Sequence, residues 1–370
     1  MSKVKETKDK PMIVALSAVD PYIATNIVEP TEKEVHGYDF IEWGAGNKYP
    51  DYVLDLYKNV PVLQSLINGS VDYTCGDDCS LSNEPFNIKV NDKDETIETL
   101  LKKIVYDWWI YGAFAINIVR NIKGGVACLY YVSVRNLRQD KKCERFWYAE
   151  DWAKSYGRVK AVEYPKFDIN GTEPSSILYV KNTWNSTYGI PVYAAATKSA
   201  EVSKSIDIYE LNSVNNGFMA SHIINFNNGQ PSPEVAQEIE DELNEKFSGV
   251  ENASRIMVAF NKSKDNAVTV EKLEQPDFHD KFESLCKWTN QQLFTAFRAA
   301  PMLFGIYQES SGFNDQDYQQ AFKLFNRTCI LPVQRLICNA FHTIFGEDVL
   351  TIIPFTIDFS EDGTEPTQVK

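Results

Sequence analysis

The sequence has no long hydrophobic run. Its apolar stretches are short, for example residues 108–111 and residues 349–353, and Thr351 interrupts the latter. Because a membrane-spanning helix needs about 18 mostly apolar residues, the sequence predicts no membrane-spanning segment. The first ten residues are charged and polar. This start predicts no secretory signal and a location in the cytoplasm of the cell that makes the protein.

Cysteine and histidine are scarce and scattered. The 7 cysteines stand at positions 75, 79, 128, 143, 286, 329 and 338, and an odd, irregular set does not indicate a disulfide framework. Cys75 and Cys79 are close, but no second pair follows at the spacing of a zinc site. The 4 histidines lie far apart. We therefore expect reduced thiols in or near a core, histidines at surfaces or interfaces, and no metal.

Basic residues are too few for a nucleic-acid clamp. The chain has 37 Lys and Arg against 51 Asp and Glu, a formal charge of −14 and a pI of about 4.9. A protein that holds nucleic acid through its phosphates normally has a basic face. The composition therefore disfavours static DNA binding but permits a protein past which DNA slides.

The motifs of common enzymes are also missing. The sequence contains neither a Walker phosphate loop nor a nucleophile elbow. Asp77 and Asp78 resemble the paired aspartates of some polymerases, but the flanking sequence predicts no matching strand and no third acid for magnesium. The acidic run at 234–245 follows the solvent side of an amphipathic helix. We predict no catalytic residue and no cofactor.

The chain does contain enough apolar residues for a sizeable core. Hydrophobic residues make up 44% of it and aromatic residues 13%, which predicts two or three globular parts. Residues 1–35 are predicted to be an extended arm. They are followed by two short helices separated by Pro61 and by a helix at 95–111. Next come a hairpin around residues 121–125 and strands at 145–148, 159–164 and 177–180. This alternation predicts an α+β first half.

Long helices dominate the second half. A helix at 192–218 has a thin apolar stripe, which suits packing among identical neighbours better than a monomer core. An insert at 219–275 contains predicted strands at 223–226, 255–260 and 268–273, and a helix starting at Ser232. The insert is followed by a second long helix at 277–299 and a loop at 306–314. The chain ends with a helical stretch at 316–345, interrupted by Pro332, and a strand at 349–359.

This order of parts, with several local segments, resembles the portal proteins of tailed bacteriophages. Residues 188–195 (YGIPVYAA) are similar to the segment before the family's first stem helix, and residues 215–218 (NNGF) to the cluster at its end. Residues 300–305 (APMLFG) resemble the P-P-x-L-x-G segment before the tunnel loop, with Ala300 in place of the first proline. Residues 111–115, 312–314 and 325–334 also match, so the resemblance covers residues 46–345.

The resemblance implies a portal-like α+β fold with an α/β wing, two long stem helices, a small α/β clip insert, a tunnel loop and a following helix. The implied parts are an N-terminal arm (1–45), wing (46–190), first stem helix (191–220), clip (221–275), second stem helix (276–300), tunnel loop (301–316), wing helices (317–347), and C-terminal strand and tail (348–370). So little chain follows the wing helices that a helical crown is expected to be short or absent.

The resemblance also implies a structural subunit, not an enzyme. Portals form dodecameric rings at one capsid vertex, in the virion and earlier in the host cytoplasm, and double-stranded DNA passes through them during packaging and ejection. The implied partners are further copies of the chain, the terminase large subunit, a head–tail adaptor, and the major capsid or scaffold protein, with no membrane and no cofactor.

Three groups of residues carry the implied functions. The tunnel loop would place residues near DNA, and these are Gln308, Glu309, Ser310, Ser311, Gly312, Phe313 and Asn314. Channel-lining candidates on the stem helices are Lys198, Lys204, Lys281, Lys287 and Arg298, although solvated or intersubunit faces explain each equally well. The acidic clip surface for a partner consists of Glu234, Glu238, Asp241, Glu242 and Glu245.

Two alternatives remain open at this point. A metal-dependent nucleic-acid-processing enzyme would depend on two or three particular carboxylates, whereas a ring subunit has no such positions. Another virion component, such as a head–tail adaptor, would usually be shorter and would lack two long helices flanking an α/β insert.

Overall fold

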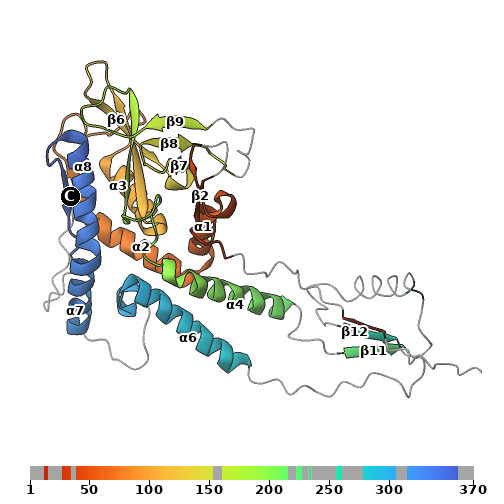
Figure 1. Cartoon of the computed structure of the whole chain (residues 1–370). Coiled ribbons are helices and arrows are strands. Elements are labelled where there is room, and N and C mark those ends of the chain that lie inside the picture. Colours follow the sequence, from red (N-terminus) through yellow and green to blue (C-terminus); the bar gives the residue numbers. More distant parts are fainter. Residues whose placement is uncertain are drawn as a thin grey trace, which may run out of the picture. The chain divides into compact units, whose positions relative to one another are not determined.

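The computed structural model describes residues 12–15, 27–34, 39–152, 161–215, 222–226, 232, 235, 256–260, 278–305 and 315–356. The chain divides into two compact units. The larger unit comprises residues 27–201 and 287–370, and the smaller comprises residues 1–26 and 202–286. Figure 1 shows the elements of each unit. Both helices and sheets are present, as the α+β prediction requires.

The first three helices of the larger unit contribute buried side chains to its core. Helix α1 spans Tyr49–Asn59 and α2 spans Pro61–Cys75, so the predicted break at Pro61 is confirmed, with the proline in the first turn of α2. Helix α3 (Ile97–Tyr111) confirms the helix predicted at 95–111. Most of its side chains are buried, from Ile97 and Leu100 to Trp109. It ends at Gly112, whose φ of 73° is a left-handed conformation that glycine adopts readily.

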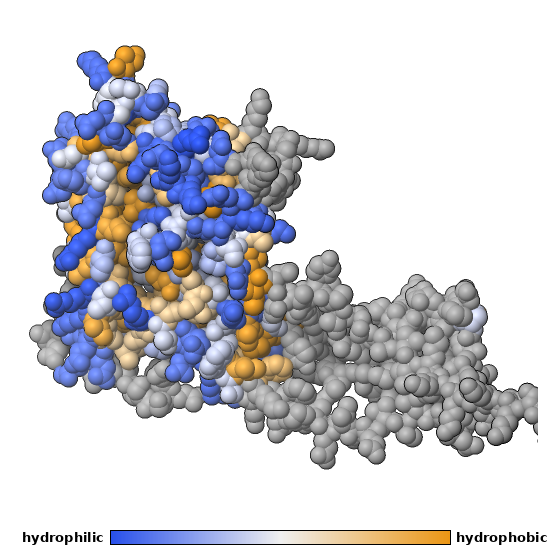
Figure 2. Space-filling view, viewed as in Figure 1, coloured by the Kyte–Doolittle hydropathy of each residue, from blue (hydrophilic) through white to orange (hydrophobic). Residues whose placement is uncertain are grey.

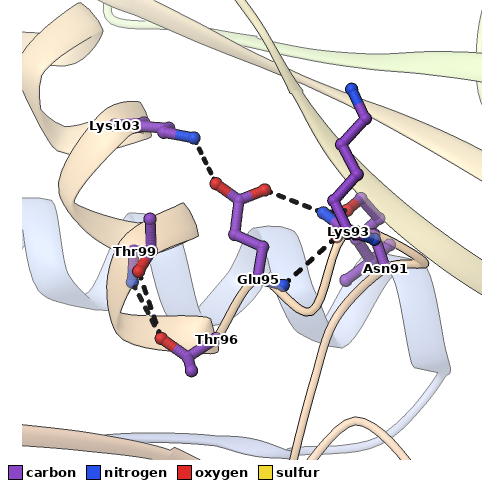
Figure 3. Close-up of polar contacts among 7 residues, drawn as sticks. Asn91, Lys93, Glu95, Thr96, Thr99 and Lys103 are labelled. Carbon is purple, nitrogen blue, oxygen red and sulfur yellow. Dashed lines mark hydrogen bonds and ion pairs between the residues drawn. The ribbon is translucent and has the colours of Figure 1, made fainter.

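A polar network fixes the start of α3 (Figure 3). Thr96 is its N-cap, because the Thr99 N–H donates to Thr96 Oγ1. The buried Asn91 side chain donates to Glu95 Oε2 at 2.7 Å and accepts from the Lys93 N–H at 3.0 Å. Lys103 pairs with the other oxygen of Glu95. The network therefore joins the first two turns of α3 to the loop before it.

The larger unit contains two three-stranded antiparallel sheets. In the first, β5 (Ala113–Arg120) lies between β6 (Val126–Val132) and β10 (Ser175–Lys181). The predicted hairpin is confirmed, and Asn121 Oδ1 closes its turn by accepting from the Lys123 and Gly125 N–H groups. The second sheet contains β7 (Leu137–Gln139), β8 (Arg145–Tyr148) and β9 (Val162–Pro165). Strands β8, β9 and β10 confirm three predicted strands, whereas β7, next to the 3-10 turn η2 (Val134–Asn136), was not predicted.

The predicted extended arm contains paired strands. Strand β2 (Glu32–Glu34) pairs antiparallel with β3 (Ile41–Trp43), which precedes the 3-10 turn η1 (Ala45–Asn47). Strand β1 (Met12–Ala15) pairs with β12 (Ile256–Phe260), and β12 pairs in parallel with β11 (His222–Phe226). Strands β11 and β12 confirm two strands predicted for the insert, and the strand predicted at 268–273 lies outside the described residues. The pairing of β1 was not predicted because its partner β12 is distant in sequence, and the local pair of β2 and β3 was not predicted either.

The described bounds of the two long helices lie inside the predicted ones. Helix α4 spans Thr197–Asn215 and α6 spans Phe278–Phe297. Helix α4 starts later than residue 192 because the 3-10 turn η3 (Ala194–Ala196) comes first. A 3-10 turn, η5 (Pro301–Phe304), follows α6. Next come helix α7 (Asp315–Phe325), the π-helical turn η6 (Asn326–Ile330) and helix α8 (Leu331–Phe345). The helix interruption predicted at Pro332 is therefore a π turn that ends just before this proline.

The region around Asp77 differs from the prediction. No strand was expected beside the paired aspartates, yet β4 (Asp78–Leu81) pairs antiparallel with β13 (Leu350–Ile353). The partner strand comes from the far end of the sequence, which local patterning could not reveal. Asp77 Oδ2 accepts hydrogen bonds from the N–H and hydroxyl of Thr356, so this carboxylate holds the chain after β13.

Candidate functional site

Within the larger unit, the start of α4 and the end of α6 meet α3 at a stack of three buried aromatic rings. Tyr193 lies just before α4 and Phe297 is the last residue of α6. Their ring centroids are 5.6 Å apart, and Phe297 lies 6.0 Å from Trp109 of α3. The Tyr193 hydroxyl donates to the Ile110 carbonyl at 2.9 Å, and Trp109 Nε1 donates to Thr74 Oγ1 at 3.0 Å. The start of α4 and the end of α6 are therefore fixed at one place, which we call the helix root.

The turn after α6 has a definite geometry. Arg298 has a φ of 54°, a left-handed conformation that is uncommon for residues other than glycine. The next N–H, of Ala299, donates to the Phe294 carbonyl and so caps the helix. The Arg298 guanidinium donates to the Thr328 carbonyl at 3.4 Å. In an α-helix the residue at 332 would donate to that carbonyl, but Pro332 has no N–H to give.

Helix α2 holds the turn that precedes the predicted tunnel loop. The Tyr73 hydroxyl donates to the Leu303 carbonyl at 2.8 Å, and the Ser65 hydroxyl lies 3.4 Å from the Phe304 carbonyl. Gly69 permits this contact, because a Cβ there would lie 2.8 Å from the Phe304 ring. Gly305 then ends the turn in a left-handed conformation. The position of residues 300–305 is therefore set by α2.

Aromatic rings from both sides of residues 306–314 converge on Tyr73. Phe304, before that stretch, lies 6.0 Å from the Tyr73 ring, and Phe322 and Phe325 of α7, after it, lie 5.5 and 6.1 Å away. Phe355, after β13, lies 5.1 Å from the same ring. This cluster holds the two flanks of the predicted loop against α2. No local pattern marks Tyr73 in the sequence, because its partners are far away in the chain.

Hydrogen bonds fix the segment between β10 and α4. Glu32 Oε1 accepts from the Ser186 hydroxyl at 2.6 Å and from the Tyr188 N–H at 3.0 Å. Burial raises the pKa of Glu32, but these hydrogen bonds outweigh burial and leave its pKa below the usual value. The Thr183 hydroxyl donates to the Tyr188 carbonyl, and the Ile190 N–H donates to Asn182 Oδ1. We call residues 182–190 the lead-in loop.

A buried arginine, Arg138, supports the lead-in loop through Trp43. The Tyr188 ring stacks on Trp43 with centroids 4.4 Å apart, and Trp43 lies 6.0 Å from the Arg138 guanidinium. Arg138 is 1% exposed. It donates to Asn47 and to the carbonyls of residues 135 and 137. Burial lowers the pKa of Arg138 to about 10, so it is still charged at neutral pH and depends on these acceptors.

The predicted channel-lining residues do not share one environment. Lys198 is exposed near the start of α4, and Lys204 is half-buried on the same helix. Lys287 is exposed on α6, whereas the side chain of Lys281 lies outside the described residues. Arg298 contacts the π turn η6, as described above. Their role in lining a channel therefore stays a prediction.

The other two predicted groups lie outside the described residues. These are Gln308, Glu309, Ser310, Ser311, Gly312, Phe313 and Asn314 in the loop, and Glu234, Glu238, Asp241, Glu242 and Glu245 in the insert. The start of the insert helix is visible at two residues. The Val235 N–H lies 3.5 Å from Ser232 Oγ, which is the N-cap contact predicted for Ser232.

Apolar side chains on the two long helices face solvent. Leu211 of α4 is 61% exposed and Trp288 of α6 is 49% exposed. Smaller exposed fractions belong to Val202, Ile208 and Leu285. By contrast, Ile206 of α4 is 5% exposed. Across the face drawn in Figure 2, apolar side chains (orange) also lie among hydrophilic ones (blue).

Enzyme-like features are weak among the described residues. No group of three His, Cys, Asp or Glu residues there could hold a metal ion. Burial raises the pKa of Cys75 and of Cys79 to about 12, so both are thiols at neutral pH. Asp78 Oδ1 accepts from the Cys79 N–H. Among the helices that the structure describes, none is long and apolar enough to cross a membrane.

Comparisons with known proteins agree with this architecture. The model of a family described as phage portal protein matches residues 82–363. No curated protein matches the chain. The chain resembles one from the virion of a native gene transfer agent (GTA) particle, with a TM-score of 0.51 and 16% identity, covering 82% of this chain and 83% of that one.

Two further solved structures are similar. One is the neck of a native GTA particle computed with C12 symmetry, with a TM-score of 0.50, 15% identity and coverage of 84% and 85%. The other is an HK97 family phage portal protein from Corynebacterium diphtheriae, with a TM-score of 0.50, 10% identity and coverage of 78% and 88%. At these identities the likeness is one of fold.

Proposed function

Because this chain belongs to the phage portal protein family, we propose that it is a subunit of a dodecameric ring at one vertex of a virion. In this proposal α4 and α6 are the stem helices, and residues 221–275 form the clip. Double-stranded DNA passes through the ring during packaging and ejection. The chain is a structural component and not an enzyme. It would assemble in the host cytoplasm with the major capsid or scaffold protein.

The exposed apolar side chains of the long helices carry this proposal. A monomer gains nothing from leaving Leu211 and Trp288 in water, whereas a neighbouring copy would bury them. Burial of apolar surface is the main favourable term in most protein association. The neck structure with C12 symmetry that shares this fold supports a ring of twelve.

The held turn at residues 300–305 supports a role for the tunnel loop. A loop that touches moving DNA needs firm attachment, and the Tyr73 cluster holds both of its flanks. Residues 302–314 contain no Lys or Arg. We propose that residues 308–314 contact DNA sterically and through polar groups, because ion pairs with phosphates would slow its passage.

The clip is proposed to bind the terminase large subunit and later the head–tail adaptor. The helix predicted to start at Ser232 would carry the acidic residues Glu234, Glu238, Asp241, Glu242 and Glu245. An acidic face suits a basic partner surface, since complementary charge speeds encounter and disfavours wrong partners. The net charge of −14 also limits adhesion of the ring to DNA.

The test is assembly of the wild-type chain and of Leu211→Asp, followed by light scattering and negative-stain microscopy. Rings near twelve times 42.1 kDa with a central hole are expected for the wild type, and loss of rings for Leu211→Asp. Ile122→Asp is the matched control, because Ile122 is fully exposed on the hairpin turn. Ile206→Asp is unsuitable, since Ile206 is buried within one chain. A wild-type monomer that cuts DNA with magnesium would overturn the proposal.

A further inference from the structure

The lead-in loop presents a tryptophan to solvent. Trp184 is 93% exposed, whereas Trp43, Trp108 and Trp109 of the same unit are at most 5% exposed. Tryptophan side chains bury 150–250 Å² or so when covered and dominate many interfaces. An almost fully exposed one is therefore a marker for a binding partner.

The loop that carries Trp184 is already ordered. Its backbone is held by Thr183, by Asn182 and by Glu32, through the hydrogen bonds described above. Lys181 Nζ adds a bond of 3.1 Å to the Thr187 carbonyl. Close packing limits movement further, because a Cβ at Gly189 would lie 2.5 Å from the Gly112 carbonyl oxygen. A rigid loop loses little entropy on binding, so more of the contact energy appears as affinity.

The absence of charged residues around Trp184 in the sequence indicates what kind of partner it binds. Residues 182–197 contain no Asp, Glu, Lys or Arg, although 24% of the chain is charged. Two copies of a protein with a charge of −14 repel one another, so their contacts are most favourable where neither carries charge. Nucleic acid fits poorly, because the segment has no cation for phosphates. The same segment leads into α4, whose Ile208 and Leu211 are also exposed.

We propose that Trp184 is an anchor residue through which one subunit binds the neighbouring copy in the ring. This inference rests on the proposed ring and names a contact outside the two long helices. Trp184 would become buried on assembly, and the uncharged residues on either side of it in the sequence would allow close approach. The ring would thus be joined at the larger unit as well as along α4 and α6.

The experiment compares Trp184→Ala and Trp184→Phe with the wild type in a concentration series followed by mass photometry. Trp184→Ala should raise the concentration at which half of the chains are assembled by about tenfold or more, as expected for an interface hot spot. Trp184→Phe should retain most of the assembly. Ile122→Ala, an equally exposed apolar side chain, should assemble like the wild type. Thermal unfolding of the unassembled chain should be the same for all four proteins.

Fluorescence provides the second readout. The difference in tryptophan emission between the wild type and Trp184→Phe should shift to the blue on assembly, because the indole leaves water. Equal assembly of Trp184→Ala and the wild type, or no blue shift, overturns this inference and leaves the ring proposal standing. A wild type that never assembles overturns both. A shift caused by adding double-stranded DNA to unassembled chains would identify nucleic acid as the partner and also refute the inference.

Discussion

Helices α3 and α4 are both long, yet their surroundings differ. Of the 15 residues of α3, those from Ile97 and Leu100 to Tyr111 include ten that are buried. Helix α4 has 19 residues, and its buried positions include the small Ser199 and Ala200 with Ile206, while Leu211 is exposed. The comparison shows that one chain is sufficient to bury α3. Helix α4 buries Ile206 within its own chain but leaves Leu211 exposed.

The largest expected effect on stability tests how tightly α3 is packed in the core of its own chain. Ile104→Ala removes a side chain that is fully buried in the core. The lost burial and the cavity left behind should lower the free energy of unfolding by about 2–5 kcal/mol. Urea denaturation of the unassembled chain measures this loss. An effect below 1 kcal/mol or so would contradict the tight packing of α3.

Asp107 of α3 provides a pH-dependent test. Burial raises its pKa to about 7, and Tyr131 and Val134 donate to its two oxygens. In the unfolded chain its pKa is about 3.9. Between those values the folded state alone takes up a proton, so the stability that Asp107 contributes is present at low pH and is lost as the pH rises through 7.

Asp107→Asn removes this dependence. The amide oxygen can accept from the Val134 N–H, and the amide nitrogen can donate to the Tyr131 hydroxyl. We expect the variant to gain stability relative to the wild type between pH 5 and pH 8, by about 2 kcal/mol. Denaturation curves at both pH values measure the gain. An equal difference between the two proteins at pH 5 and pH 8 would show that Asp107 does not titrate in this range.

A smaller effect is expected at the helix root, where α4 meets α3. Tyr193→Phe keeps the ring on Phe297 but removes the hydroxyl that donates to the Ile110 carbonyl. Loss of one buried hydrogen bond should cost about 1–2 kcal/mol. Thermal unfolding of the unassembled chain gives the value, and Tyr106→Phe, on the less buried side of α3, is the control. Equal small losses of stability in both variants would mean that the Tyr193 hydroxyl contributes no more to stability than a less buried one.

The smallest effect on stability is expected at Leu211 of α4. Leu211→Ala should change the free energy of unfolding of the unassembled chain by less than about 0.5 kcal/mol, because the side chain is largely exposed. The same substitution should weaken assembly. Denaturation and mass photometry on one preparation give both values. A large loss of monomer stability would show that Leu211 belongs to the core of its own chain.

Sequence patterns predicted much of the fold where contacts are local. The hairpin around Asn121, the break at Pro61 and the helix ending near Tyr111 depend on neighbours in sequence, and all three are confirmed. The order of long helices and insert also led to the portal family. The bounds of α4 were less accurate, because the uncharged residues before Thr197 fit a helical pattern but form a 3-10 turn.

Contacts between distant parts of the sequence could not be predicted. Strand β4 pairs with β13, and Tyr73 of α2 receives rings from residues 304, 322, 325 and 355. A pattern of period two or 3.6 describes one element and not its partner. Trp184 also escaped notice, because a lone tryptophan in a polar stretch has no periodicity to mark its exposure.

The pairing of β1 with β12 has a consequence for the timing of synthesis. Met12–Ala15 are made early, but their partners Met257–Phe260 leave the ribosome only after the intervening chain has been translated. At about 5–20 residues per second this delay is on the order of 10 to 50 s. During that interval the larger unit's first helices and sheets can fold, while an apolar strand at the start of the chain has no partner. The sheet of the smaller unit can therefore be completed only late in translation.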